Sequence, residues 1–165
     1  MTNNSIAFIG LCNEYCACIE NARETELKDF VASMTRLLPR IYISAATINE
    51  DNFDDNGFIG ESLEEESYDM IRRNLEMLFG EYDTYLEVFE SDMKYSETPI
   101  GASIAEGLTD LFQVFYNFIE TVRDAPEELV CSSLSAIKED FQFYWGQTLC
   151  NVMRPLHKLH YDENE

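Results

Sequence analysis

Apolar residues recur at three- and four-residue intervals along most of this chain, which is the period of an α-helix. Four stretches show this pattern before the last one, and none alternates polar and apolar residues as a half-buried strand would. We therefore predict an all-α fold, a compact bundle of five or six helices that forms a single domain over residues 1–161, followed by a disordered acidic tail at 162–165. The pattern is clearest in the last third, at Val130, Leu134, Ile137, Phe141, Trp145, Leu149, Val152, Leu156 and Leu159.

Capping residues set the expected helix boundaries. Ser62 with Glu65, and Ser103 with Glu106, follow the capping-box pattern, in which each side chain bonds the other residue's backbone N–H. An acidic, glycine-containing stretch over residues 48–61 reads as a loop. The expected helices span residues 4–21, 25–42, 62–80, 98–122 or 103–122, and 127–160.

Proline and glycine predict irregularities inside these helices. Pro39 predicts a kink or break in the second helix, because it removes a backbone donor and clashes with the preceding turn. Gly146 and Pro155 predict a bend in the last helix. Residues 82–89 predict a short additional helix. A strand over residues 85–89 is the alternative, but the sequence offers it no evident partner strand.

The charge of the chain excludes two classes of partner. The sequence has 32 Asp and Glu against 11 Lys and Arg, a formal net charge of −21. Nucleic acids and anionic membranes both require a basic face, so we expect neither as a partner. The acids are concentrated between residues 49 and 97, where 16 acidic residues face three basic ones. This excess indicates either a solvated surface or a docking surface for a cationic partner.

The acidic loop is the candidate contact with such a partner. Acids that are interleaved with large apolar residues favour a contact, because charges raise the association rate and aromatic side chains supply affinity. The candidate contact residues are Asp51, Phe53, Asp54, Asp55 and Phe58. The alternative is that the two phenylalanines only pack against the bundle and so anchor the loop to it.

A second candidate site is a pocket between helices. Glu106 and Asp110 lie one turn apart on the polar side of the fourth helix, so the pair could act as acid and base, or simply face solvent. Together with Trp145 and His157 they would line the pocket of an enzyme or a small-molecule binder.

Motifs for metals, cofactors and catalysis are missing from the sequence. The cysteines form no Cys-x-x-Cys pair, and neither His157 nor His160 belongs to a Glu-x-x-His motif. An EF-hand register that begins at Asp51 fails, because Phe53 would occupy a ligand position. No glycine-rich phosphate loop is present. We therefore expect no metal, no cofactor and no catalytic residues, and we lean against an enzyme.

Cysteine use and hydropathy favour one compartment. No apolar run approaches the roughly 18–20 residues that a membrane-spanning helix needs, and no basic, apolar leader begins the chain. Five cysteines are an odd number in a chain that can bury a real core, which favours free thiols over a disulfide framework. We expect a cytoplasmic protein.

Four motifs distributed over the chain carry a family resemblance. They are Asn13-Glu-Tyr-Cys, Leu38-Pro-Arg-Ile-Tyr42, the stretch Thr98-Pro-Ile-Gly-Ala-Ser-Ile-Ala-Glu-Gly-Leu-Thr-Asp110, and Tyr144-Trp-Gly-Gln with Asn151 and Leu156-His-Lys-Leu-His160. Together they resemble the bacterial DUF5063 family of domains of unknown function over nearly the whole chain. The resemblance implies a small, mostly helical, cytoplasmic protein, and it supplies no activity and no functional residues.

These observations lead to three functional hypotheses. The first is a non-enzymatic interaction or regulatory module that binds a cationic partner through its acidic loop. The second is an enzyme or small-molecule binder that uses the pocket near Trp145 and His157. The third is an immunity or inhibitor protein against a cationic toxin. The sequence leaves the oligomeric state open.

Overall fold

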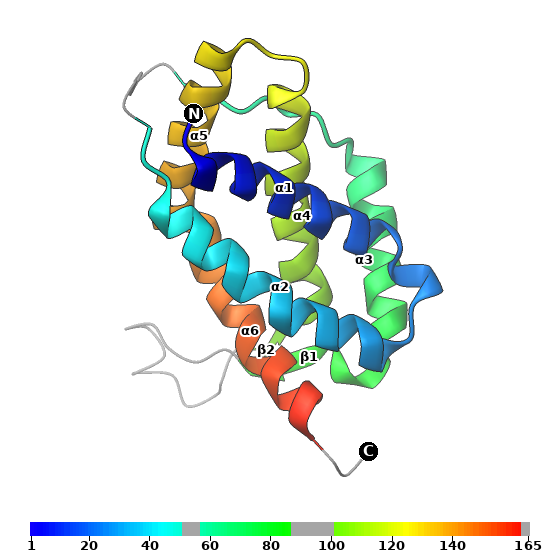
Figure 1. The fold of residues 1–165 in the computed structure, drawn as a ribbon. Coiled ribbons are helices and arrows are strands. Elements are labelled where there is room, and N and C mark those ends of the chain that lie inside the picture. Colours follow the sequence, from blue (N-terminus) through cyan, green and yellow to red (C-terminus); the bar gives the residue numbers. More distant parts are fainter. Residues whose placement is uncertain (51–56, 87–100, 163–165) are drawn as a thin grey trace, which may run out of the picture.

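Helix α4 (Ile104–Val122) lies at the centre of the computed structural model, which describes residues 1–50, 57–86 and 101–162 (Figure 1). Helices α1, α3, α5 and α6 all pack against α4, and α2 packs against α1 and α6. The apolar stripe of each helix faces this shared core, so the predicted all-α bundle is confirmed. The surrounding helices are α1 (Asn3–Glu20), α2 (Leu27–Thr47), α3 (Glu65–Phe79), α5 (Glu127–Asp140) and α6 (Gly146–Tyr161), with 3₁₀ turns at Ala22–Glu24 and Gly80–Tyr82.

The sequence predicts a kink or a break at Pro39, and the break is wrong because helix α2 continues through this residue. Leu38 and Ile41 on either side of the proline are fully buried. Burying such side chains contributes about 1.5–3 kcal/mol each, which offsets one missing backbone hydrogen bond. Packing against α1 and α6 therefore keeps the helix intact.

A π-helical turn over Phe141–Trp145 divides the long final helix that the sequence predicts. A Cβ atom at Gly146 would lie 2.5 Å from the carbonyl oxygen of Phe141, so this turn requires glycine at its end. The turn directs Trp145 into the core and leaves Phe143 83% exposed. The predicted irregularity at Gly146 is thus a π turn, and α6 passes Pro155 without ending.

A two-stranded antiparallel sheet precedes α4. Strand β1 (Thr84–Leu86) pairs with β2 (Gly101–Ser103), with Thr84 opposite Ser103. The short helix predicted over residues 82–89 is wrong at 84–86, and the strand alternative finds its partner just before α4. Residues 87–100 lie outside the described residues.

The two predicted capping boxes have different outcomes. Ser103 is the N-cap of α4, and its Oγ accepts the backbone N–H of Glu106 at 3.1 Å. At the start of α3 the N-cap is Glu64, and the backbone N–H of Ser62 is donated to Asn117 Oδ1 instead. The capping box at Ser62 is therefore wrong, because a long-range bond to α4 takes over its donor.

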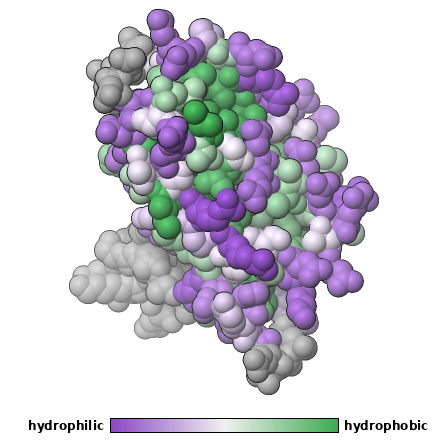
Figure 2. Space-filling view, in the orientation of Figure 1, coloured by the Kyte–Doolittle hydropathy of each residue, from purple (hydrophilic) through white to green (hydrophobic). Residues whose placement is uncertain are grey.

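Polar side chains cover most of the face shown in Figure 2, while apolar side chains gather over the crossing of α1 and α4. Ile9, Val122 and Val130 line a hollow of about 570 Å³ between α1, α4 and α5. Within the described residues, no helix combines the length and hydropathy required to cross a membrane.

Candidate functional site

The polar side of α4 holds the end of the acidic loop. Asn117 Oδ1 accepts the backbone N–H groups of Ser62 at 3.0 Å and Leu63 at 2.8 Å. One turn further, Thr121 Oγ1 accepts the N–H of Gly60 at 2.9 Å. This side of α4 is therefore not a plain solvated surface, because it fixes the backbone of the segment that leads into α3.

The same segment rests closely on α5. A Cβ atom at Gly57 would lie 2.2 Å from the carbonyl oxygen of Ser132, so the backbone can approach α5 only with glycine there. Ser133 Oγ donates a hydrogen bond to the carbonyl oxygen of Phe58 at 3.3 Å, while the Phe58 side chain is 61% exposed. The loop is thus held by its backbone, and the Phe58 side chain is left largely to solvent.

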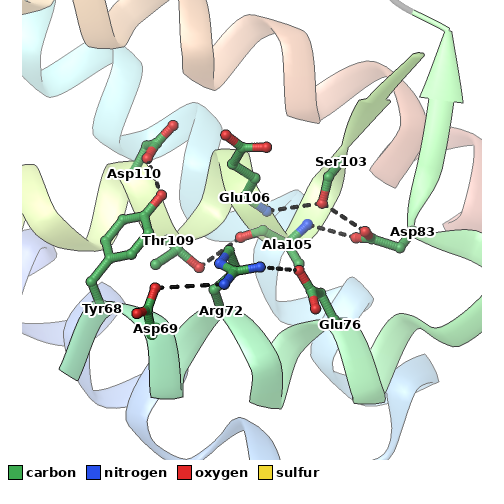
Figure 3. A network of polar contacts seen from close by, with 10 residues as sticks. All are labelled: Tyr68, Asp69, Arg72, Glu76, Asp83, Ser103, Ala105, Glu106, Thr109 and Asp110. Carbon is green, nitrogen blue, oxygen red and sulfur yellow. Dashed lines mark hydrogen bonds and ion pairs between the residues drawn. The ribbon is translucent and has the colours of Figure 1, made fainter. Parts of the chain in front are cut away.

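Four acidic residues follow this exposed phenylalanine in the sequence. Glu61, Glu64, Glu65 and Glu66 are all exposed, and none belongs to an ion pair within the described part of the chain. We call residues 57–66 the acidic segment. Arg72 does not neutralise it, because its guanidinium pairs with Asp69 and Glu76 at 3.5 and 2.8 Å (Figure 3).

The other predicted contact residues cannot be placed beside Phe58. Asp51, Phe53, Asp54 and Asp55 lie outside the described residues. Their contribution to a contact surface stays a prediction from the sequence.

A polar cavity of about 250 Å³ lies beside the first turns of α4, between the β-hairpin and α6. Gly107 lets the two helices meet closely at its wall, because a Cβ atom there would lie 2.4 Å from Cγ1 of Val152. The polar residues that line the cavity are Tyr85, Ser103, Glu106, Asp110, Thr148 and Asn151.

Asp83 fixes the start of α4 at this cavity (Figure 3). Its Oδ1 accepts the backbone N–H of Ala105 at 2.7 Å, and its Oδ2 accepts the hydroxyl of Ser103 at 2.6 Å. A helix N-terminus attracts anions through its free N–H groups, but here the Asp83 carboxylate already occupies that position. The start of α4 is therefore closed to a phosphate ligand.

Asp110 is a half-buried carboxylate at the far side of the cavity. Tyr68 of α3 donates its hydroxyl to Asp110 Oδ1 at 2.5 Å. Burial raises the pKa of Asp110, and the Tyr68 hydrogen bond opposes that rise only in part. Burial and the nearby Asp110 charge also raise the pKa of Tyr144, so Asp110 lies near tyrosines from both α3 and the π-helical turn.

Comparison with known proteins supplies a family. A family model described as "Domain of unknown function (DUF5063)" matches residues 1–162. The chain belongs to the DUF5063 family. The crystal structure of protein BF1032 from Bacteroides fragilis is 28% identical in sequence, with a TM-score of 0.83, and the match covers 99% of this chain and 96% of that chain. No curated protein matches this DUF5063 chain. The resemblance noted in the sequence is confirmed, and it assigns no activity.

The DUF5063 fold brings together only two of the four predicted pocket residues. Glu106 and Asp110 both line the cavity. Trp145 is fully buried and donates its Nε1–H to the carbonyl oxygen of Ile137 at 3.1 Å, so it belongs to the core. His157 is exposed on α6, with its ring 4.8 Å from that of Tyr161. The predicted pocket near Trp145 and His157 is therefore wrong in these two residues.

Sequence reasoning missed the remaining polar residues of the DUF5063 cavity. Thr148 and Asn151 are three residues apart on α6, and that spacing could have marked a face with two polar residues beside Val152. Asp83 and Tyr68 are far from α4 in sequence, and no local pattern connects them to it.

Proposed function

We propose that this protein is a non-enzymatic interaction module that binds a cationic segment of a partner protein on its acidic segment, residues 57–66. The observation that carries the proposal is the exposed Phe58 on a backbone held by α4 and α5, followed in sequence by four exposed glutamates that form no ion pair within the described residues. A backbone that is already ordered loses little conformational entropy on binding. An exposed aromatic ring can supply affinity, while the surrounding charges steer a basic partner and exclude acidic ones.

The proposal includes a cytoplasmic location in a bacterium. All five cysteines are free, which suits a reducing compartment, and the similar solved structure is a bacterial protein. If this protein inhibits a cationic toxin, it would use the same acidic surface. A cationic toxin is therefore one class of partner within this proposal.

The first test concerns the aromatic ring. Phe58→Ala should lower capture of basic proteins from a bacterial lysate, measured by quantitative mass spectrometry, by about 30-fold, because a buried aromatic anchor contributes about 2 kcal/mol to an interface. Phe143→Ala is the matched control, since Phe143 is 83% exposed on the π-helical turn. Equal losses for both variants, or captured proteins that are mainly acidic, would contradict the proposal.

The charges are tested with a second matched pair in the same assay. Glu61→Gln with Glu64→Gln should weaken capture most at low salt, where screening is least. Glu24→Gln with Glu26→Gln removes the same charge, and Glu26 is the N-cap of α2 as Glu64 is of α3. The control pair should leave capture unchanged. Identical salt dependence for the two pairs would mean that only the overall charge matters.

A further inference from the structure

We propose that the polar cavity beside α4 binds a small organic cation that carries a primary ammonium group. This site lies on the hairpin side of α4, and it does not depend on the docking of a partner protein at the acidic segment. Three independent features of the cavity carry the proposal: its unpaired carboxylates, its closure to anions, and its size and donor set.

The carboxylates of the cavity have room for a cation. Glu106 and Asp110 are one helical turn apart, a rise of about 6 Å, so one ammonium group can lie between them. Neither belongs to an ion pair within the described residues. Asp110 Oδ1 accepts the Tyr68 hydroxyl, while none of the described donors is bonded to Oδ2.

The first basic residue of α6 forms its contacts elsewhere. Arg154 donates to the carbonyl oxygen of Leu86, and its guanidinium lies 6.0 Å from the centroid of the Tyr85 ring. That position is compatible with a cation–π contact at the hairpin. Arg154 therefore braces the hairpin and leaves the carboxylates of α4 without a positive partner.

Anionic ligands do not fit the cavity. The N–H groups at the start of α4 already bond Asp83 and Ser103, so they cannot cradle a phosphate. Two further carboxylates in the lining would repel an anion. This excludes phosphorylated ligands and nucleotides, and it leaves cationic or neutral ones.

The available oxygen atoms favour an ammonium group over a metal ion. Calcium takes six to eight oxygen ligands, and within the described residues no group of three or more His, Cys, Asp and Glu side chains could hold a metal. A primary ammonium has three N–H donors, which match the two carboxylates and one neutral oxygen. Thr148 in the lining offers a hydroxyl oxygen. Asn151 Oδ1 already accepts one hydrogen bond from Gln147, and it keeps a second lone pair for such a donor.

The volume of the cavity limits the rest of the ligand. A typical small-molecule site measures roughly 300–1,000 Å³, so a cavity of about 250 Å³ is suited to a small molecule. The half-buried Asp110 carboxylate lies in a less polar environment than bulk water, where a charge pair is stronger than on an open surface. A short alkylamine or diamine satisfies both conditions.

Isothermal titration calorimetry of the full-length protein with 1,4-diaminobutane and n-butylamine tests the site. Both amines should bind saturably with one molecule per chain, and 1-butanol should not bind. Asp110→Asn and Glu106→Gln should each weaken amine binding at least tenfold. Glu120→Gln is the control, because it also removes a carboxylate from α4. The Glu120 carboxylate pairs with Arg123 and does not line the cavity. Phe58→Ala should leave amine binding unchanged, which separates this site from the docking surface.

Three results would overturn the proposal. The first is the absence of saturable heat with either amine up to about 10 mM, well above the micromolar-to-millimolar range of most small ligands. The second is an equal loss of binding in Glu120→Gln, which would reveal only an attraction to net negative charge. The third is displacement of butylamine by equimolar calcium or tetramethylammonium, because neither carries the N–H donors that are proposed to bond the oxygens of the site. Thermal melts of each variant confirm that it is folded.

Discussion

Asp110 carries a charge that the folded protein tolerates at a cost. Its pKa is raised from the ordinary value of 3.8, mainly by burial, so the folded state binds a proton at this carboxyl more readily than the unfolded state does. Such a group stabilises the fold below its unfolded pKa, and this stabilisation is lost as the pH rises through the folded pKa. At neutral pH the ionised Asp110 therefore lowers the free energy of unfolding.

Asp110→Asn should consequently raise the melting temperature at pH 7, because asparagine keeps an acceptor for the Tyr68 hydroxyl without the buried charge. The gain should shrink as the pH falls through the raised pKa of Asp110, because the native carboxyl is then protonated as well. Glu106→Gln is the control, since an exposed carboxylate contributes little to stability. Thermal melts from pH 7 to pH 4 measure the difference. A lower melting temperature for Asp110→Asn at pH 7 would show that the Tyr68 bond to the ionised carboxylate outweighs burial.

At the residue scale, the sequence predicted which cavity residues share a face where both lie on the same helix. Glu106 and Asp110 share a face because they are four residues apart, and both line the cavity. Trp145 also belongs to the apolar stripe of the final helix, and the structure buries it in the core with the rest of that stripe. His157 lies outside the stripe and is exposed on α6. Which residues of different helices share a cavity depends on tertiary packing, which the spacing within one helix does not determine.

The contact of α4 with α6 gives a prediction at the element scale. Gly107→Ala places a Cβ atom 2.4 Å from Cγ1 of Val152, so the two helices must separate or Val152 must change its rotamer. We expect the free energy of unfolding to fall by about 1–3 kcal/mol, the usual range for overpacking a core. Urea denaturation of the purified variant measures this change.

Gly10→Ala is the matched control for that experiment. Gly10 lies inside α1, and a Cβ atom there would have no neighbour within 4 Å. Alanine should therefore stabilise the protein by about 0.5–1 kcal/mol, the difference between the two residues within a helix. In Gly107→Ala, the further change Val152→Ala should cost less than it does alone, because it removes the clash. Stabilisation by Gly107→Ala would show that α4 and α6 are not closely packed there.

Elements were predictable where one stripe of apolar residues determines them. Helices α1 to α4 follow their periodicity because each buries one face. The start of α3 and the hairpin were not predictable from the sequence, since both depend on partners that are distant in sequence. Asn117 takes the N–H of Ser62, and β1 forms only because β2 lies before α4. The predicted cap at Ser103 is confirmed, because its hydrogen bond joins residues only three positions apart.

At the scale of the whole molecule, charge repulsion opposes the folded state. The net charge is −21, and the described residues form only five ion pairs, none of which involves a buried side chain. Repulsion between like charges is greater in the compact state than in the expanded unfolded chain. Salt reduces this repulsion, because the Debye length falls from about 30 Å at 10 mM to about 8 Å at 150 mM ionic strength.

The melting temperature at pH 7.5 should therefore rise by several degrees when sodium chloride is raised from about 10 mM to about 150 mM, the range over which screening changes most. The same titration near pH 4.2, the isoelectric point expected from the sequence, should show little change, because the net charge and hence the repulsion vanish there. Potassium chloride should act as sodium chloride does, since only ionic strength matters in this account. Differential scanning fluorimetry at micromolar protein concentration measures all three series. A melting temperature that is independent of salt at pH 7.5 would mean that local ion pairs, rather than the overall charge, govern stability, and it would also weaken the case for long-range attraction of a cationic partner.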